Sequence, residues 1–231
     1  MFGPRYMIEP TDRSQGDPTG APTENRSDAA DCGFPLAAGG RVADLYVENS
    51  DYPGVVRATG DLAEDLARVT GRRPPLVHDP AALNEFAVIV GTIGRNGVVD
   101  RLIGSGRLDA ADLAGKWESF VVQTVADPLP GVREALVIAG SDKRGTIFGI
   151  YDLCEQIGVS PWHWWADVPV TRRTELFVRR GVYRQGEPTV KYRGIFLNDE
   201  GPSLMTWVRA NFPDFTHEFY ERVFELLLRL K

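Results

Sequence analysis

The chain has 231 residues, of which 43% are hydrophobic and 25% charged, and its formal net charge is −6. These proportions are typical of a soluble globular protein, and the acidic balance argues against a nucleic-acid-binding protein, which would carry a basic patch. No window reaches the roughly 18 consecutive apolar residues of a membrane span. The first ten residues also lack the apolar core of a secretory signal, so we expect a cytoplasmic protein.

The first 32 residues are rich in Pro, Gly, Asp, Thr, Ser and Arg, with almost no aliphatic residues. Such a segment cannot bury enough apolar area to offset the entropy lost on ordering. We therefore predict a disordered tail over residues 1–32.

The pattern then changes to alternating strands and helices. Val42–Val47 reads as a strand, and a helix capped by Ser50 or Asp51 follows, with Pro53 in its first turn and Gly71 as its end. Further strands are predicted at Leu76–Val77, Phe86–Val90, Ser119–Val125 and Ala135–Ala139, and further helices at Val98–Ile103 and from Ile147 to Gly158. This alternation predicts an α/β domain over residues 33–185, with helices packed on a sheet.

A glycine-rich segment, Gly140–Gly145, lies between a predicted strand and a predicted helix. Helix N-termini can hold a phosphate, but the segment matches neither the dinucleotide fingerprint nor the P-loop, because Gly145 is followed by Thr146 and no lysine. We favour a tight strand-to-helix turn, with Ser141 or Asp142 as the helix cap, over nucleotide binding.

A second unit is predicted over residues 186–231. Tyr192–Asn198 reads as a strand, and a helix begins near Phe215 or Thr216. That helix is still apolar at Lys231, and no Gly, Pro or polar cap closes it. An apolar face that ends so abruptly lacks a partner, which indicates a truncated chain.

The candidate catalytic group is Asp199, with Asn198 and Glu200 beside it as candidate substrate-binding residues. They follow the predicted strand Tyr192–Asn198, and polar groups at the carboxyl end of a barrel strand lie where barrel active sites form. The alternative is that Asp199 and Glu200 are turn residues before a proline. Trp207 is a further candidate for substrate binding, although it could equally be a buried anchor.

Three tryptophans occur within Trp162–Trp165, and their faces could stack on sugars. Packing at the joint between two units is the interpretation we favour, since large amphipathic side chains often fill such joints. His163 is expected to be a hydrogen-bonded structural residue. The two cysteines, Cys32 and Cys154, and the scattered histidines match no metal-ligand spacing, so we predict no metal and no cofactor.

Four segments occur together in this order: Gly115–Phe120, Ala139–Thr146, Gly158–Pro169 and Val190–Glu200. In combination they resemble glycoside hydrolase family 115, and the likeness covers about residues 40 to 231. The resemblance implies an α-glucuronidase that removes glucuronic acid or its 4-O-methyl form from xylan side branches, with inversion of configuration. It also implies a multidomain enzyme, of which this chain would hold the N-terminal α/β domain and the first strand and helix of a truncated TIM-like barrel.

The resemblance gives Asp199 a role in the active site and places the other catalytic carboxylates beyond Lys231, so the fragment is expected to be inactive alone. The expected partner is xylan or a glucuronoxylo-oligosaccharide, with no nucleic acid and no membrane, and a homodimer of the full-length enzyme is left open. An anionic uronate needs a cationic partner, for which Arg144 and Arg193 are both conceivable.

Three other functions compete with this one. A non-catalytic carbohydrate-binding or interaction module would explain the clustered tryptophans, but the unfinished helix counts against it. A helper domain of another glycosidase, such as a hexosaminidase, is ranked lower because of the Trp-rich segment. A nucleotide-binding domain is disfavoured by the missing phosphate motif.

Overall fold

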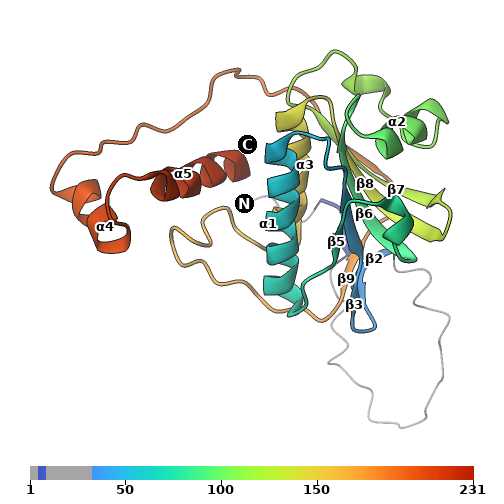
Figure 1. The fold of residues 1–231 in the computed structure, drawn as a ribbon, viewed down its shortest axis with the longest axis horizontal. Coiled ribbons are helices and arrows are strands. Elements are labelled where there is room, and N and C mark those ends of the chain that lie inside the picture. The colour runs from blue at the N-terminus through green and yellow to red at the C-terminus, as the bar shows by residue number, and fades with distance from the viewer. Residues whose placement is uncertain (1–4, 9–32) are drawn as a thin grey trace, which may run out of the picture.

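The computed structural model describes residues 5–8 and 33–231 of the chain. Its main body is a six-stranded mixed sheet with helices on both faces (Figure 1). Across the sheet the order is β10 (Val182–Gln185), β7 (Phe120–Leu129), β8 (Val132–Gly140), β6 (Phe86–Thr92), β4 (Asp44–Val47) and β5 (Leu76–Val77). The last four strands are parallel, whereas β7 is antiparallel to β8 and β10 is antiparallel to β7. The predicted α/β class is therefore confirmed.

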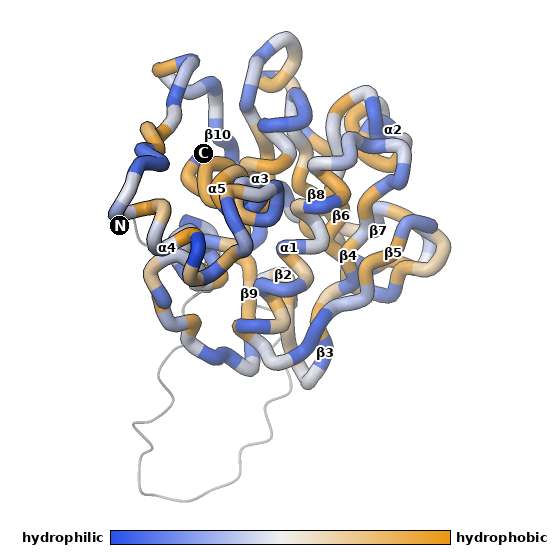
Figure 2. The backbone as a smooth tube through the Cα atoms, turned by 60° about the vertical axis from the view of Figure 1, so that its left-hand side comes forward, coloured by the Kyte–Doolittle hydropathy of each residue, from blue (hydrophilic) through white to orange (hydrophobic). Residues whose placement is uncertain are grey.

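Three helices cover this sheet: α1 (Pro53–Thr70), α2 (Gly97–Gly104) and α3 (Lys143–Gln156). Helices α1 and α3 lie on one face and α2 on the other (Figure 1). Side chains alternate along the strands: Leu45 and Leu136 belong to the core under α1 and α3, and their neighbours Tyr46 and Val137 belong to the core under α2. Both faces are buried, which explains the continuous apolar runs in the sequence and the hydrophobic colour of the central strands in Figure 2.

The ends of α1 show how far local signals determine a helix. Gly71 has φ 78° at the end of the helix, as predicted, and Pro53 occupies the first turn. The residue before the helix is Tyr52, however, and the predicted cap Asp51 has another role. Its two carboxylate oxygens accept hydrogen bonds from the backbone N–H groups of Tyr52 and Thr92, both at 2.7 Å. Asp51 thus ties the start of α1 to the end of β6.

A smaller antiparallel sheet lies beside the main one, in the order β1 (Met7–Ile8), β9 (Leu176–Val178), β2 (Phe34–Ala38) and β3 (Arg41–Val42). The predicted strand Val42–Val47 is therefore divided between two sheets. The prediction of disorder differs from the structure for residues 5–8, because Tyr6 and Met7 are buried and the Tyr6 hydroxyl donates to Asp152 at 2.8 Å. The rest of the predicted tail, including Cys32, lies outside the described residues.

Beyond β10 the chain crosses residues 186–202 without regular structure and then forms two helices, α4 (Ser203–Asn211) and α5 (His217–Leu230). Helix α5 begins close to the predicted position, and α4 was not predicted. The predicted strand Tyr192–Asn198 is wrong for this structure, since residues 191–200 are all exposed and outside any sheet. A strand needs ladder hydrogen bonds from a neighbour, and no described strand lies beside this segment. The barrel and the boundary at residue 186 stay predictions.

Two short 3₁₀ helices, η2 (Pro80–Ala82) and η3 (Ala111–Leu113), complete the described elements. None of the helices in the described ranges is both long enough and apolar enough to cross a membrane.

Candidate functional site

The candidate catalytic segment Asn198–Glu200 lies on the surface, directly before α4. All three residues are exposed, and the backbone N–H of Glu200 donates to Asn198 Oδ1 at 3.2 Å. Among the described residues, no hydrogen bond or ion pair engages the Asp199 carboxylate. The segment thus presents an unpaired acid to solvent without an enclosing cleft.

Trp207 is held in an aromatic cluster formed by Trp164, Trp165, Trp207, Phe212 and Phe219. The rings of Trp165 and Trp207 are stacked, with centroids 5.5 Å apart, and the rings of Trp165 and Phe219 meet edge to face at 6.2 Å. This geometry is the preferred one for paired aromatic rings. The structure therefore brings Trp207 together with the tryptophan segment, not with Asp199.

The aromatic cluster joins the loop after α3 to α4 and α5. The indole Nε1 of Trp165 donates to the Arg222 carbonyl of α5 at 3.3 Å. Trp162 lies outside the cluster and is 43% exposed. The geometry therefore agrees with the packing interpretation for Trp164 and Trp165. Trp207 is 37% exposed and so remains partly accessible to solvent.

His163 is half-buried next to this cluster. Its Nδ1 lies 3.1 Å from the Ser160 carbonyl oxygen. Burial lowers the pKa of His163 from its usual value, and the nearby Arg229 guanidinium lowers this pKa further. His163 thus favours the neutral form and has the local hydrogen bond expected of a structural residue.

The segment Gly140–Gly145 is the predicted tight turn. Asp142 caps α3 by accepting a hydrogen bond from the Gly145 N–H at 2.8 Å. A Cβ atom at Gly145 would lie 2.3 Å from the Ser119 carbonyl oxygen, and one at Gly140 would lie 2.1 Å from the Thr146 nitrogen. The glycines therefore serve close backbone packing, and a carboxylate of the chain already occupies the helix N-terminus.

The two arginines considered for a uronate both contact Glu118. Its carboxylate accepts a hydrogen bond from Arg193 Nη2 at 2.7 Å and forms an ion pair with Arg144 Nε, also at 2.7 Å, and its side chain is only 2% exposed. Sequence analysis missed Glu118, although it lies in the segment Gly115–Phe120. A single acid between Trp117 and Ser119 has no distinctive spacing, and only the fold brings the two arginines to it.

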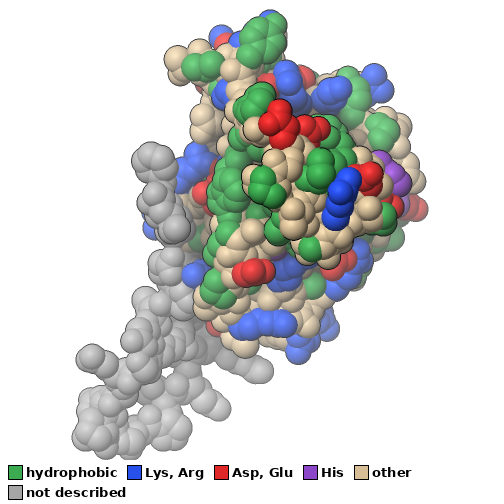
Figure 3. Space-filling view, turned by 90° about the vertical axis from the view of Figure 1, so that its left-hand side faces the viewer, with side chains coloured by type: hydrophobic (Ala, Val, Ile, Leu, Met, Phe, Trp, Pro, Cys, Tyr) green, Lys and Arg blue, Asp and Glu red, His purple; other side chains and the backbone are tan. Residues whose placement is uncertain are grey.

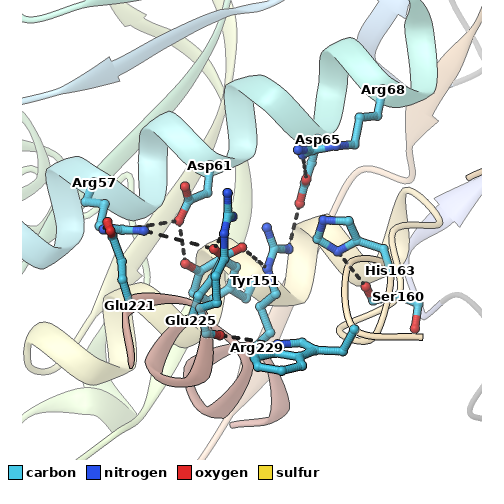
Figure 4. A network of polar contacts seen from close by, with 12 residues as sticks. Arg57, Asp61, Asp65, Arg68, Tyr151, Ser160, His163, Glu221, Glu225 and Arg229 are labelled. Carbon is cyan, nitrogen blue, oxygen red and sulfur yellow. Dashed lines mark hydrogen bonds and ion pairs between the residues drawn. The ribbon is translucent and has the colours of Figure 1, made fainter. Parts of the chain in front are cut away.

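A second charged network lies between α1, α3 and α5 (Figure 4). Arg229 of α5 is 3% exposed and donates from Nη1 to Asp65 of α1 at 2.7 Å, while its Nε donates to Glu225 at 2.8 Å. The same guanidinium lies over the ring of Tyr151, 4.6 Å from its centroid. The Tyr151 hydroxyl donates to Asp61 at 2.6 Å. These groups are buried and mutually paired, so they dock α5 and are not available to a substrate.

Burial determines how the acids of this network titrate. Desolvation raises the pKa of Asp61 above its usual value, although the hydrogen bond from Tyr151 opposes the shift. Desolvation also raises the pKa of the Tyr151 hydroxyl, and the Asp61 charge adds to the effect. Throughout the described residues, every fully buried side-chain nitrogen or oxygen has a hydrogen-bond partner.

A cavity of about 590 Å³ lies near the C-terminal end of α1 and is lined in part by Arg41, Arg72 and Arg73. Arg72 donates to the Gly40 carbonyl, and Arg73 pairs with Glu64 at 2.7 Å. Positive charges here stabilise the C-terminal end of α1, which carries the negative end of the helix dipole. The helix itself therefore explains these arginines without a bound ligand. Within the described part of the chain, no cluster of three or more His, Cys, Asp or Glu residues could hold a metal ion.

Comparison with known proteins gives two related results. The family model described as "Glycosyl hydrolase family 115" matches residues 185–231. The solved structure of BtGH115A, described as a 4-O-methyl-α-glucuronidase with specificity for decorated arabinogalactans, matches with 34% sequence identity and a TM-score of 0.69. The match covers 85% of this chain and 25% of that enzyme. The chain therefore spans about a quarter of that enzyme's length.

Two β-hexosaminidase structures also match, but at a level that carries no argument. The family 20 enzyme from Streptomyces coelicolor A3(2) and a mutant enzyme from Streptomyces plicatus are each 15% identical, with TM-scores of 0.39 and 0.38. Each match covers 68% of this chain and 24% of the other protein. The comparison with curated proteins found no match.

Proposed function

Because this chain belongs to glycoside hydrolase family 115, we propose that it forms the N-terminal part of an enzyme that removes glucuronic acid, or its 4-O-methyl form, from polysaccharide side branches. The observation that carries the proposal is the 34% identity to a 4-O-methyl-α-glucuronidase across 85% of the chain. Independently, the family model matches residues 185–231.

The proposed reaction is hydrolysis of the glycosidic bond with inversion at the anomeric carbon. One carboxylic acid protonates the leaving oxygen while a second carboxylate activates water on the opposite face of the sugar, and the two groups stand about 6.5–9.5 Å apart. We assign Asp199 to this machinery, with the Asn198 amide and the Glu200 carboxylate able to hydrogen-bond sugar hydroxyls. Trp207, which is 37% exposed, is assigned a contact with the saccharide.

The chain of 231 residues is proposed to be inactive by itself. Asp199 is exposed, and the described residues enclose no second carboxylate with it in a cleft, so they provide neither the acid–base pair nor the exclusion of water. The missing carboxylates would come from sequence beyond Lys231. A cytoplasmic location and a homodimer of the full-length enzyme belong to the same proposal.

Uronic-acid release from glucuronoxylan provides the test, with this chain compared to a protein extended past Lys231. Release by the extended protein alone supports the proposal. Release by the short chain would show that no further carboxylate is needed, and release by neither protein on any uronate-bearing polysaccharide would refute the activity.

Asp199→Asn in the extended protein tests the assigned residue. The matched control is Asp127→Asn, the same change at an exposed aspartate in the α/β domain. We expect Asp199→Asn to lower kcat by at least about 100-fold, the lower end of a general acid–base contribution, and Asp127→Asn to leave it unchanged. Near-normal turnover of the Asp199 variant would remove this residue from the site.

The polysaccharide itself is the finer question. We propose glucuronoxylan, and the specificity described for BtGH115A makes a decorated arabinogalactan the second candidate. Parallel assays of the extended protein on both polymers distinguish them, since the values of kcat/KM on the two substrates measure the preference directly.

A further inference from the structure

The buried carboxylate of Glu118 joins the α/β domain to the segment that carries Asp199. Glu118 has φ 51°, a left-handed conformation that non-glycine residues rarely adopt. Such a conformation persists only where the surrounding structure fixes it, and it is concentrated at functional positions. The contacts of Glu118 must therefore hold this conformation in place.

The backbone around Glu118 is held rigidly by the turn before α3. The Glu118 N–H donates to Asp142 Oδ2 at 3.0 Å, so the cap of α3 also binds this residue. The Ser141 N–H donates to the Ser119 carbonyl at 2.9 Å, and the Ser119 N–H donates to Ser141 Oγ at 3.1 Å. Gly145 allows this close approach, because any side chain there would place a Cβ atom 2.3 Å from the Ser119 carbonyl oxygen. Glu118 thus projects from a fixed base.

The Glu118 carboxylate divides its oxygens between two different parts of the chain. Oε1 forms an ion pair with Arg144 in the first turn of α3, and Oε2 accepts a hydrogen bond from Arg193, which lies in the family-matched segment. The bond from Arg193 is charge-assisted, and such hydrogen bonds are about twice as strong as neutral ones. The side chain of Arg144 is 51% exposed and that of Arg193 only 30% exposed, so the second pair is better shielded from solvent.

Arg193 uses its remaining donors to hold the backbone around it. Nη1 donates to the Val190 carbonyl at 2.7 Å, and Nε donates to the carbonyl of Lys231, directly after α5, at 3.2 Å. Its guanidinium also lies 5.9 Å from the centroid of the Phe148 ring. One side chain therefore connects α3, the extended segment and the end of α5, whereas residues 194–200 downstream are all exposed.

We propose that Glu118 and Arg193 act as a positioning pair that fixes where the Asn198–Glu200 segment leaves the α/β domain. Arg193 is a positioning residue in this role and not a ligand of the uronate, because Glu118 and backbone carbonyls engage all three of its side-chain nitrogens. The functional part of the inference rests on the proposed glucuronidase activity. Arg144 shares Glu118 but holds no part of residues 190–200, which makes it the natural control.

Backbone ¹⁵N relaxation on the 231-residue chain tests the positioning pair without any activity. Arg193→Met and Glu118→Gln should increase the fast mobility of residues 190–200, while Arg144→Met should leave it at the wild-type level. Circular dichroism verifies that each variant is folded. If Glu118→Gln does not fold, Arg193→Met alone tests the pair. Unchanged mobility in Arg193→Met, or an equal increase in Arg144→Met, overturns the proposal.

Kinetics of the protein extended past Lys231 give the second readout. Arg193→Met should lower kcat by about tenfold to 100-fold with KM within about twofold, because a misplacement of about 1 Å can cost about 100-fold. Arg144→Met should change neither, and equal losses in both variants would indicate a merely structural role. If the wild-type extended protein releases no uronic acid, the proposed function fails, and the relaxation experiment still decides whether the pair positions the segment.

Discussion

The α/β body and the region after residue 186 are held together by different forces. In the body, long-range strand pairing and two apolar cores bury nearly all large side chains, and glycines such as Gly140 and Gly145 permit backbone contact. The later region attaches through an aromatic cluster, the Arg229–Asp65 pair and the Arg193–Glu118 pair. The difference teaches that this chain joins its two regions largely by specific polar and aromatic contacts.

Exposed apolar side chains are also distributed differently between the α/β body and the region after residue 186. Tyr192 is 85% and Phe196 is 91% exposed in the extended segment, and Phe224 of α5 is 58% exposed. Figure 3 shows hydrophobic side chains lying between charged ones on the side of the molecule that carries α4 and α5. In the body, side chains of this size are mostly buried.

The largest loss of stability should follow from crowding the body. We expect Gly145→Ala to lower the free energy of unfolding by about 4 kcal/mol or more, because the new Cβ would meet the Ser119 carbonyl and neither backbone can move freely. Urea unfolding followed by circular dichroism measures this. Gly60→Ala is the control, since no heavy atom lies within 4 Å of its Cβ position. That change should stabilise α1 by up to about 1 kcal/mol.

The aromatic cluster offers the next comparison, within a single helix. Phe219 is 1% exposed and Phe224 is 58% exposed. Phe219→Ala should cost about 3 kcal/mol through lost burial and a residual cavity, whereas Phe224→Ala should change stability by less than about 0.5 kcal/mol. Amide exchange of α5 in the two variants measures the difference. Equal protection in both would mean that α5 does not depend on the cluster.

The buried ion pair predicts a loss of similar size to that of Phe219→Ala. Arg229→Met leaves Asp65 fully buried with Arg68 as its remaining cation, so we expect a loss near the lower end of the about 3–5 kcal/mol typical of a broken buried pair. Removing the exposed pair by Arg73→Met should cost less than about 1 kcal/mol. Unfolding of the two variants under identical conditions provides the measurement, and a small loss for Arg229→Met would show that Asp65 is satisfied without it.

The smallest expected effect concerns pH and His163. Because the folded-state pKa of His163 is lowered, the unfolded chain binds the proton more readily, and stability falls as pH decreases through the unfolded pKa of about 6.5. His163→Gln removes this dependence, so wild type should lose stability relative to the variant between neutral pH and the lowered folded-state pKa. Urea unfolding of both proteins across that pH range tests the sign of the effect. A stability difference that does not change with pH would contradict the prediction.

Much of the body was predictable because its signals are local. The apolar runs at residues 86–90 and 135–139, the stop at Gly71 and the cap at Asp142 each depend on a few adjacent residues, and the structure confirms them. The candidate residues Asn198, Asp199 and Glu200 came from their position after the predicted strand and then from the resemblance, and their roles stay proposals. The strand expected at residues 192–198 failed because strand formation depends on a neighbour, which sequence periodicity alone does not supply.

The sequence by itself therefore determined the α/β class, the order of most elements and the family, because hydrophobic periodicity, caps and motifs are written in consecutive residues. Only the tertiary structure decided that Met7 and Ile8 join a sheet with β9, that Trp207 packs on Trp165, and that Glu118 pairs with Arg144 and Arg193. Each of these contacts joins residues far apart in the chain. Their formation depends on the geometry of the whole fold, since no local propensity specifies which distant side chain will be within reach.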